Sequence, residues 1–230
     1  MSTVLVTGSA DGIGRQSAVA LLGAGHEVWL HARNEQRASD ATAAEVGPFD
    51  VVIHNAGVGG QRERQVTGDG LELTFQVNVI APYLLTALVP PPRRLVYLTS
   101  GLQSGGVVDL DDLQHERGAW NGMQVYSTSK LYDVVLAVAV ARLWTNAYSN
   151  AVDPGWVKTR MGGPSATDEL PQGADTQVWL ATSSDPTALV TGRYFKHRTE
   201  LPPHPATHDL SVQQGLLAAC ERLTGVALPR

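Results

Sequence analysis

The chain has 230 residues, 43% of them hydrophobic, and a net charge of −5 at pH 7. This composition is typical of a soluble globular protein, and the acidic balance gives no electrostatic reason to expect nucleic acid or an anionic membrane as a partner. The single cysteine, Cys220, excludes an internal disulfide framework and suits a reducing compartment, so we expect a cytoplasmic protein. No signal peptide is recognisable, and the longest apolar run, Val134 to Ala141, is far shorter than the ~20 residues of a spanning helix.

Short apolar runs alternate with longer helical patterns along the chain. Strands are expected near residues 3–7, 27–31, 50–54, 94–99, 147–152 and 192–195, and helices near 12–23, 70–88, 126–144, 172–182 and 209–223. This alternation predicts a single α/β domain, residues 1–230, built on a doubly wound parallel sheet.

A glycine-rich turn follows the first expected strand. The run Thr7-Gly8-Ser9-Ala10-Asp11-Gly12-Ile13-Gly14 separates that strand from a helix. Glycines let the backbone approach a pyrophosphate closely, and the helix N-terminus offers the anion free N–H groups and a favourable dipole. Strand, turn and helix in this order indicate a nucleotide site, although an ordinary tight turn has the same pattern.

Tyr126 and Lys130 lie four residues apart in one expected helix. Residues i and i+4 share a helix face, so the ammonium group can lie close enough to the phenol to act on its proton. A neighbouring cation favours the phenolate, which would make the phenol a usable proton donor and acceptor. The spacing alone is common, because a buried tyrosine beside a solvated lysine also shows it.

Seven motifs in one order make the pattern specific. They are Thr7-Gly8-x-x-x-Gly12-Ile13-Gly14, Asn55-Ala56-Gly57, Val77-Asn78-Val79, Ser100 at a strand end, Tyr126-x-x-x-Lys130, Asp153-Pro154-Gly155-Trp156-Val157-Lys158-Thr159, and Gly192-Arg193-Tyr194-Phe195. Together they resemble the short-chain dehydrogenase/reductase family over roughly residues 3–196. The segment 67–72 and the long interval from Ser100 to Tyr126 look most like the retinol-dehydrogenase-like branch. The resemblance implies a Rossmann-type fold and hydride transfer between a nicotinamide cofactor and a carbonyl compound or its alcohol.

The resemblance also implies the roles of the site residues. Tyr126 would be the general acid/base, Ser100 would orient the reacting oxygen, and Lys130 would act on Tyr126 and bind the nicotinamide ribose. Asn78 would hold a water that relays protons to Lys130. Ser104 is a rival to Ser100, which we prefer because it lies directly at the strand end. The cofactor would contact Gly8, Ser9, Asp11, Gly12, Ile13, Gly14, Asn55, Ala56, Gly57, Tyr126, Lys130, Pro154, Gly155, Val157 and Thr159.

The region after the second strand departs from the family pattern. Only about seventeen residues, 33–49, connect it to the next strand, and a parallel crossover alone takes about a dozen. We therefore predict six parallel strands, without the usual third edge strand, and a connection that crosses the first strand. No acid ends the second strand, where an NAD site normally has one. Arg33, assisted by Arg15, can instead meet a 2′-phosphate, so NADP(H) is expected in preference to NAD(H).

Two other functions are compatible with parts of the pattern, and the sequence also carries expectations about substrate, metal and assembly. A non-catalytic NADP(H)-binding regulatory protein is the main alternative, but such proteins typically lose the tyrosine or the lysine. A nucleotide-sugar epimerase or dehydratase would usually carry a larger C-terminal region. We expect a small-molecule carbonyl or alcohol substrate, no metal, and a possible homodimer through the helix that holds Val134 to Ala141. Residues 199–208 are expected to be a proline-rich loop rather than a metal site. Candidate apolar residues of the substrate pocket are Leu102, Trp120, Met123, Trp156 and Met161.

Overall fold

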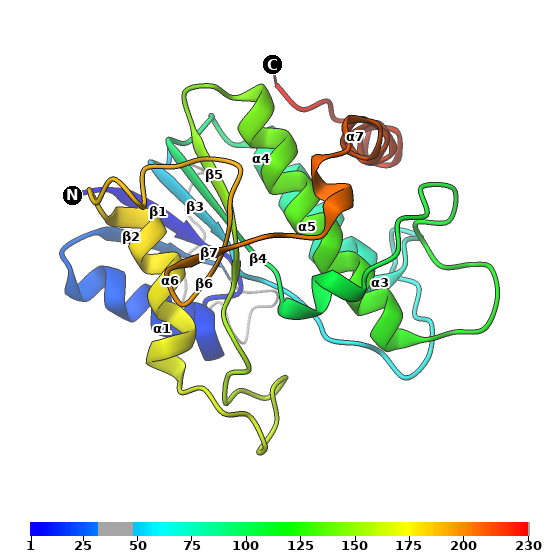
Figure 1. Cartoon of the computed structure of the whole chain (residues 1–230), viewed down its shortest axis with the longest axis horizontal. Coiled ribbons are helices and arrows are strands. Elements are labelled where there is room, and N and C mark those ends of the chain that lie inside the picture. Colours follow the sequence, from blue (N-terminus) through cyan, green and yellow to red (C-terminus); the bar gives the residue numbers. More distant parts are fainter. Residues whose placement is uncertain (32–47, 230) are drawn as a thin grey trace.

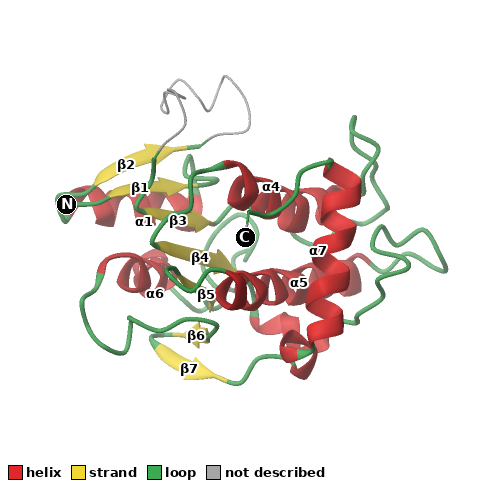
Figure 2. Cartoon of the chain, turned by 90° about the horizontal axis from the view of Figure 1, so that it is seen from above, coloured by secondary structure: helices red, strands yellow, loops and turns green. Residues whose placement is uncertain are grey.

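The computed structural model describes residues 1–31 and 48–229, which form one seven-stranded sheet with helices on both faces (Figure 1). The strands are β1 (Thr3–Val6), β2 (Glu27–Leu30), β3 (Val51–His54), β4 (Arg94–Leu98), β5 (Tyr148–Asp153), β6 (Tyr194–Lys196) and β7 (Thr199–Leu201). The helices are α1 (Gly12–Gly23), α3 (Leu73–Phe75), α4 (Ala81–Leu88), α5 (Gly122–Leu143), α6 (Leu170–Thr182) and α7 (Leu210–Thr224). Figure 2 shows α1 and α6 on one face, α4 and α5 on the other, and α7 outside α5.

Six of the strands run parallel, in the order β2-β1-β3-β4-β5-β6, and they are the six that the sequence predicts. The order places β2 and β3 on either side of β1, so the connection between them crosses the first strand as expected. The predicted absence of an edge strand falls on residues 36–47, which lie outside the described residues, as does Arg33.

The seventh strand, β7, corrects the predicted count of six. It pairs antiparallel with β6 at the edge of the sheet. The hairpin turns at His197 and Arg198, both of which have positive φ, 48° and 58°. A two-residue turn of this kind normally carries Asn, Asp or Gly. The sequence shows none of these residues there, and β7 is only three residues long, so the pattern gave no hairpin signal.

Capping side chains define where the helices begin. Asp11 caps α1 by accepting a hydrogen bond from the N–H of Gly12 at 2.8 Å. Asn121 caps α5 by accepting from the N–H of Gln124 at 3.1 Å, so α5 starts four residues earlier than predicted. The segment predicted as one helix over 70–88 is divided into α3, a π-helical turn at Gln76–Ile80, and α4. N-cap bonds of this type typically stabilise a helix by ~1 kcal/mol.

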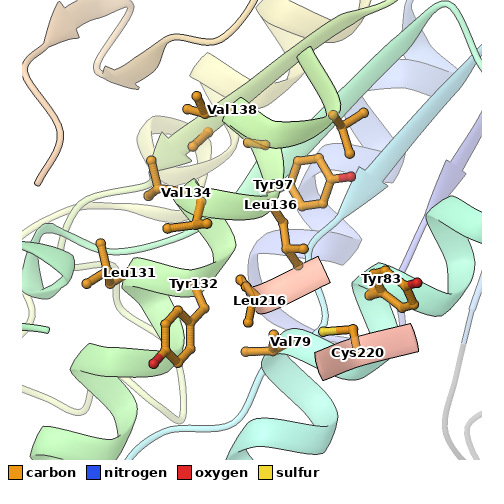
Figure 3. Packing of buried hydrophobic residues seen from close by; sticks show 14 of the residues in the cluster. Val79, Tyr83, Tyr97, Leu131, Tyr132, Val134, Leu136, Val138, Leu216 and Cys220 are labelled. Atoms are coloured by element: carbon orange, nitrogen blue, oxygen red, sulfur yellow. The ribbon is translucent and has the colours of Figure 1, made fainter. Parts of the chain in front are cut away.

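The main apolar core lies where α5 packs between the sheet and α7 (Figure 3). Every residue from Leu131 to Val140 is buried, and Leu216 and Cys220 of α7 cover the outer side of the helix. Burial raises the pKa of the Cys220 thiol to about 12, in accord with a packing role. The apolar stretch expected to support a homodimer is therefore covered within the chain and gives no reason to expect a second copy. No helix among the described residues combines the length and apolar character needed to cross a bilayer.

Leu216 offers a direct test of the contribution of α7 to stability. Replacing Leu216 by Ala should lower the free energy of unfolding by ~3 kcal/mol, because the side chain is fully buried and its loss leaves a cavity. Leu210→Ala, in the same helix but half exposed, should change it by less than ~0.5 kcal/mol. Denaturant melts of both variants give the comparison, and equal losses would show that α7 does not close the core.

Candidate active site

The carboxyl ends of the parallel strands open into one cavity of about 920 Å³. Its size is that of a site for a cofactor or a drug-sized ligand. Ser100 and Tyr126 line it, together with six of the predicted cofactor residues: Ile13, Gly57, Pro154, Gly155, Val157 and Thr159. The other predicted cofactor residues of the described chain are not part of this lining and lie in the turn after β1, in the first turn of α1, in the loop after β3 or on α5: Gly8, Ser9, Asp11, Gly12, Gly14, Asn55, Ala56 and Lys130. The parallel sheet thus brings distant motifs to one edge.

The glycine-rich turn is held from the neighbouring strand by the motif at Asn55. The side-chain amide of Asn55 donates to the carbonyl oxygens of Thr7 and Gly8 at 2.8 and 3.3 Å. The Thr7 hydroxyl in turn accepts from the N–H groups of Asn55 and Ala56, both at 2.9 Å. A Cβ on Gly14 would lie only 2.4 Å from the Asn55 amide nitrogen, so glycine is required there. The two motifs form one structural unit.

His31 ties the end of β2 to the same turn, a contact that the sequence analysis did not anticipate. Its N–H donates to Ser9 Oγ at 2.8 Å, and its ring Nδ1 accepts from the N–H of Gly8 at 3.4 Å. Burial lowers the pKa of His31, which favours the neutral ring that this acceptor role requires. The His31 side chain therefore carries no charge beside the turn near neutral pH.

Tyr126 lies in the second turn of α5 and borders the cavity beside Ser100. The Tyr126 hydroxyl lies 4.0 Å from the sulfur of Met161, which also lines the cavity. Ser100 follows the end of β4 by two residues and caps the 3-10 helix at Gly101–Gly105, where its hydroxyl accepts from the N–H of Leu102 at 3.3 Å. Ser104 is exposed, stands outside the lining and donates to the Gly101 carbonyl oxygen at 3.0 Å. The geometry accordingly favours Ser100 over its rival.

Four of the five predicted apolar residues lie on the cavity wall: Leu102, Met123, Trp156 and Met161. Each remains about half exposed. The fifth, Trp120, stands outside the lining and donates its indole N–H to the Gln61 carbonyl oxygen at 3.0 Å. Exposed side chains of this size on one wall can cover an apolar ligand.

Lys130 is placed differently from the sequence expectation. Its ammonium group donates to the Asp133 carboxylate at 2.7 Å and to the Leu98 carbonyl oxygen at 2.9 Å, beneath the cavity. It lies 5.9 Å from the centre of the Tyr126 ring. Lys130 therefore lies near the face of the ring, and its hydrogen bonds go to Asp133 and Leu98 rather than to the Tyr126 hydroxyl. Sequence reasoning missed Asp133, whose only signal was a carboxylate in an otherwise apolar run.

The Lys130–Asp133 pair is buried on both sides, which sets its electrostatics. Burial raises the pKa of Asp133 to about 6, and the Lys130 ammonium opposes this shift. Burial also acts to lower the pKa of Lys130, but the facing carboxylate outweighs it and keeps that pKa above the ordinary value. Lys130 thus remains a cation whose charge is largely matched by its neighbour.

Comparison with known proteins shows the family of this chain. A family model described as enoyl-(acyl carrier protein) reductase matches residues 35–190. Short-chain dehydrogenase chry4 of Gibberella zeae is 35% identical over all of this chain and 99% of its own length. The chain belongs to the short-chain dehydrogenase/reductase family. Human retinol dehydrogenase 14 is 30% identical over 97% of the chain and 86% of its own length, as the resemblance to that branch led us to expect.

Solved structures share the fold. An uncharacterised protein from Mycobacterium paratuberculosis superposes with a TM-score of 0.86 at 22% identity, covering 100% of this chain and 96% of its own. A carbonyl reductase from chicken fatty liver, bound to NADPH, superposes with a TM-score of 0.63 at 18% identity, covering 87% of this chain and 98% of its own. This short-chain dehydrogenase/reductase is therefore an oxidoreductase with the Rossmann-type fold, of a family that uses a nicotinamide cofactor and small-molecule substrates.

Asn78 holds the loop after β3 against α5. Its side-chain amide donates to the Val58 carbonyl oxygen at 3.0 Å and to Ser129 Oγ at 2.9 Å, and its oxygen accepts from the N–H of Val58 at 2.9 Å. Asn78 lies in the π-helical turn, where the helix that precedes Ala81 is locally widened. The side chain of this residue thus positions Gly57 and Val58 on the cavity wall.

Within the described residues, no group of three His, Cys, Asp or Glu side chains could hold a metal ion. His204, in the segment expected to be a loop, accepts from the N–H of Ala206 at 3.2 Å and caps a short 3-10 helix at Pro205–His208. Its ring is therefore used as a local cap.

The buried ion pair makes a measurable prediction. Removing one partner of a buried pair leaves an uncompensated charge, so Asp133→Leu should lower the free energy of unfolding at pH 7 by ~3 kcal/mol. Lys130→Met should cost a similar amount, and the double variant should lose much less than the sum of the two. Chemical denaturation of the four proteins tests this. Additive losses would show that the two side chains do not interact energetically.

Proposed function

We propose that the protein interconverts a carbonyl compound and its alcohol with NADP(H), and that Tyr126 is the general acid/base. The observation that carries the proposal is the convergence of Tyr126 and Ser100 on one cavity with Gly155 and Thr159, the latter two from the predicted cofactor set. Proton transfer needs a donor beside the reacting oxygen, and the phenol borders the space that a substrate would fill.

The residues present fit a dinucleotide. The turn after β1 lies close to the loop after β3, because a Cβ on Gly8 would lie only 2.9 Å from the Ala56 Cα. Gly8 also has a φ of +63°, which favours glycine at this position. The N-terminus of α1 follows at Gly12 and presents N–H groups suited to a pyrophosphate. When bound, the cofactor supplies or accepts the hydride.

The preference for NADP(H) rests on three observations. The end of β2 carries no acid that would bind a ribose 2′-hydroxyl. Arg33 follows two residues after His31 and can form a charge-assisted fork with a 2′-phosphate. The chicken carbonyl reductase, which has the same fold, binds NADPH.

The roles of the chain's own groups follow from their positions. Tyr126 gives a proton to the substrate oxygen during reduction and takes it back during oxidation. Ser100 donates a hydrogen bond to the same oxygen and orients it. In this proposal Lys130, whose ammonium group lies 5.9 Å from the centre of the Tyr126 ring, acts on the phenol proton and, by family likeness, binds the nicotinamide ribose. Asn78 keeps the Gly57–Val58 wall in place beside Lys130 and, in the proposal, holds the relay water.

One observation favours the alternative, a non-catalytic NADP(H)-binding regulatory protein. The Lys130 ammonium is turned to Asp133 and Leu98 rather than to the Tyr126 hydroxyl. If that pairing persisted with the cofactor bound, the phenol would lack its assisting cation. Loss of NADPH absorbance with a panel of aldehydes and ketones distinguishes the two functions, because a regulatory protein would bind NADPH without consuming it.

Tyr126→Phe should lower turnover by ~10²–10⁴-fold, the range for a lost acid/base group, while NADPH binding is retained because the ring still packs. Ser100→Ala should reduce the rate by less. Tyr132→Phe is the matched control, since Tyr132 lies on the same helix and its hydroxyl accepts from the N–H of Asp109 away from the cavity. Single-turnover hydride transfer and cofactor titration are measured together. Near-normal hydride transfer by Tyr126→Phe would mean that another acid acts.

Cofactor selectivity gives an independent test. NADPH should bind at least ~10-fold more tightly than NADH, a difference of about 1.4 kcal/mol. Arg33→Ala should weaken NADPH much more than NADH, because only NADPH carries the 2′-phosphate. Arg222→Ala, on the exposed side of α7, serves as the control for general loss of positive charge. Equal weakening of both cofactors by Arg33→Ala would argue against the 2′-phosphate role.

A further inference from the structure

The cavity contains a charged corner that the proposed chemistry does not use. Among the described residues, three charged side chains line the cavity: Asp153, Arg160 and Lys196. Arg160 is largely exposed and lies 3.8 Å from Asp11, beside the cofactor turn. Lys196 lies at the end of β6, next to Asp153 at the end of β5. It is the cation on the side of the cavity away from the glycine-rich turn.

Asp153 anchors this lysine. The Asp153 side chain is 4% exposed, and its second carboxylate oxygen lies 3.1 Å from the Lys196 ammonium group. Its first oxygen accepts from the N–H of Gly155 at 2.9 Å. A buried carboxylate held in this way restricts where the ammonium group can lie, and so pre-organises the lysine.

The pair lies close to the catalytic serine. A Cβ on Gly101 would be 3.1 Å from the same Asp153 oxygen that binds Lys196, and Gly101 directly follows Ser100. Ser100, Tyr126 and Lys196 all line the same cavity, so a substrate whose carbonyl group meets Ser100 and Tyr126 can extend toward the Lys196 ammonium group. The half-exposed Trp156 and Met161 offer apolar surface on the same cavity.

Lys196 retains hydrogen-bonding capacity toward the cavity. An ammonium group has three N–H donors, and the Lys196 ammonium group is ion-paired with Asp153 at 3.1 Å. The side chain is 38% exposed, so it is open to a ligand in the cavity. A second anion bound by the same ammonium group would gain a charge-assisted hydrogen bond in a partly apolar site.

We propose that Lys196 forms an anion subsite and that the substrate is an aromatic or apolar carbonyl compound that also carries an anionic oxygen, either a carboxylate or a phenolate. This inference rests on the proposed carbonyl chemistry and names its substrate class. Asp153 is the positioning residue of the subsite. If Lys196 served only to neutralise Asp153, its removal would affect charged and neutral substrates alike.

The test uses the ortho, meta and para carboxybenzaldehydes and their methyl esters as probes, with NADPH. At least one acid should have a KM about 10-fold below that of its ester, the effect of one charge-assisted hydrogen bond. Lys196→Gln should raise the KM of that acid by about the same factor with little change in kcat, and should leave the KM of the ester within about 2-fold. Added salt should reduce the preference for the acid. The hydroxybenzaldehydes, measured above and below the pKa of their phenol groups, show whether a phenolate can replace the carboxylate.

Matched variants separate binding from folding. Lys196→Arg keeps the cation and should retain the preference for the acid. Arg193→Gln removes an exposed cation paired with Glu200 and should leave the preference for the acid unchanged. If Lys196→Gln does not fold because Asp153 is left unpaired, the double variant Asp153→Asn, Lys196→Gln removes both charges and should still lose the preference for the acid.

Failure of this inference and failure of the proposed function give different results. An acid that binds no better than its ester, or equal losses for both in Lys196→Gln, overturns the anion subsite. If no probe is reduced, calorimetric binding of the same acids and esters to the NADPH complex decides. If the acid binds more tightly than the ester and this preference disappears in Lys196→Gln, the anion subsite is supported while carbonyl reduction is not. If the acid and the ester bind equally well, the anion subsite is rejected.

Discussion

The burial of α5 is the constraint on which the rest of the structure depends. The helix lies between the sheet and α7, and its residues from Leu131 to Val140 are all withdrawn from water. A helix packed on two sides cannot rotate or shift without opening the core. Its N-terminal turns, which carry Tyr126, extend beyond this packing to the carboxyl edge of the sheet. The position of the phenol is therefore set by apolar packing at the other end of the helix.

The Lys130–Asp133 pair is the polar exception within this packing. Two buried charges are costly to desolvate, and their attraction offsets that cost only when the geometry is close, as it is at 2.7 Å. Lys130 lies about one helix turn from Tyr126 and Asp133 about two, so the stability of the core and the electrostatics of the site share the same residues. A change at Asp133 would reach the phenol through Lys130 without touching the cavity wall.

Different parts of the site offer different kinds of contact. Next to the cavity lining, Gly8 in the turn after β1 and Gly14 in the first turn of α1 bring backbone into close approach, and this segment suits a phosphate-bearing ligand. Trp156 and Met161 provide apolar surface, and the Lys196–Asp153 corner provides charge. Binding by apolar contact with a few placed polar groups is the usual way in which a site combines affinity with orientation. Under the proposed function, this division would orient the carbonyl compound relative to Tyr126 and Ser100.

The amino-acid sequence by itself determined the six parallel strands, the main helices and the residues that meet at the sheet edge. The strands and helices follow from local periodicity, and the site residues from the resemblance to short-chain dehydrogenases/reductases. The rule that parallel strands end at one edge then places Ser100 and Gly155 together although they are distant in the chain. Only the tertiary structure decided that α7 covers the apolar face of α5, that Lys130 turns to Asp133, and that Lys196 meets Asp153. Periodicity shows which face of a helix is apolar, but the partner that covers it, and the direction a long side chain takes, depend on contacts between segments far apart in the sequence. The β6–β7 hairpin was not predicted for a related reason. Its turn residues, His197 and Arg198, adopt positive φ, whereas Asn, Asp or Gly normally occupy such positions.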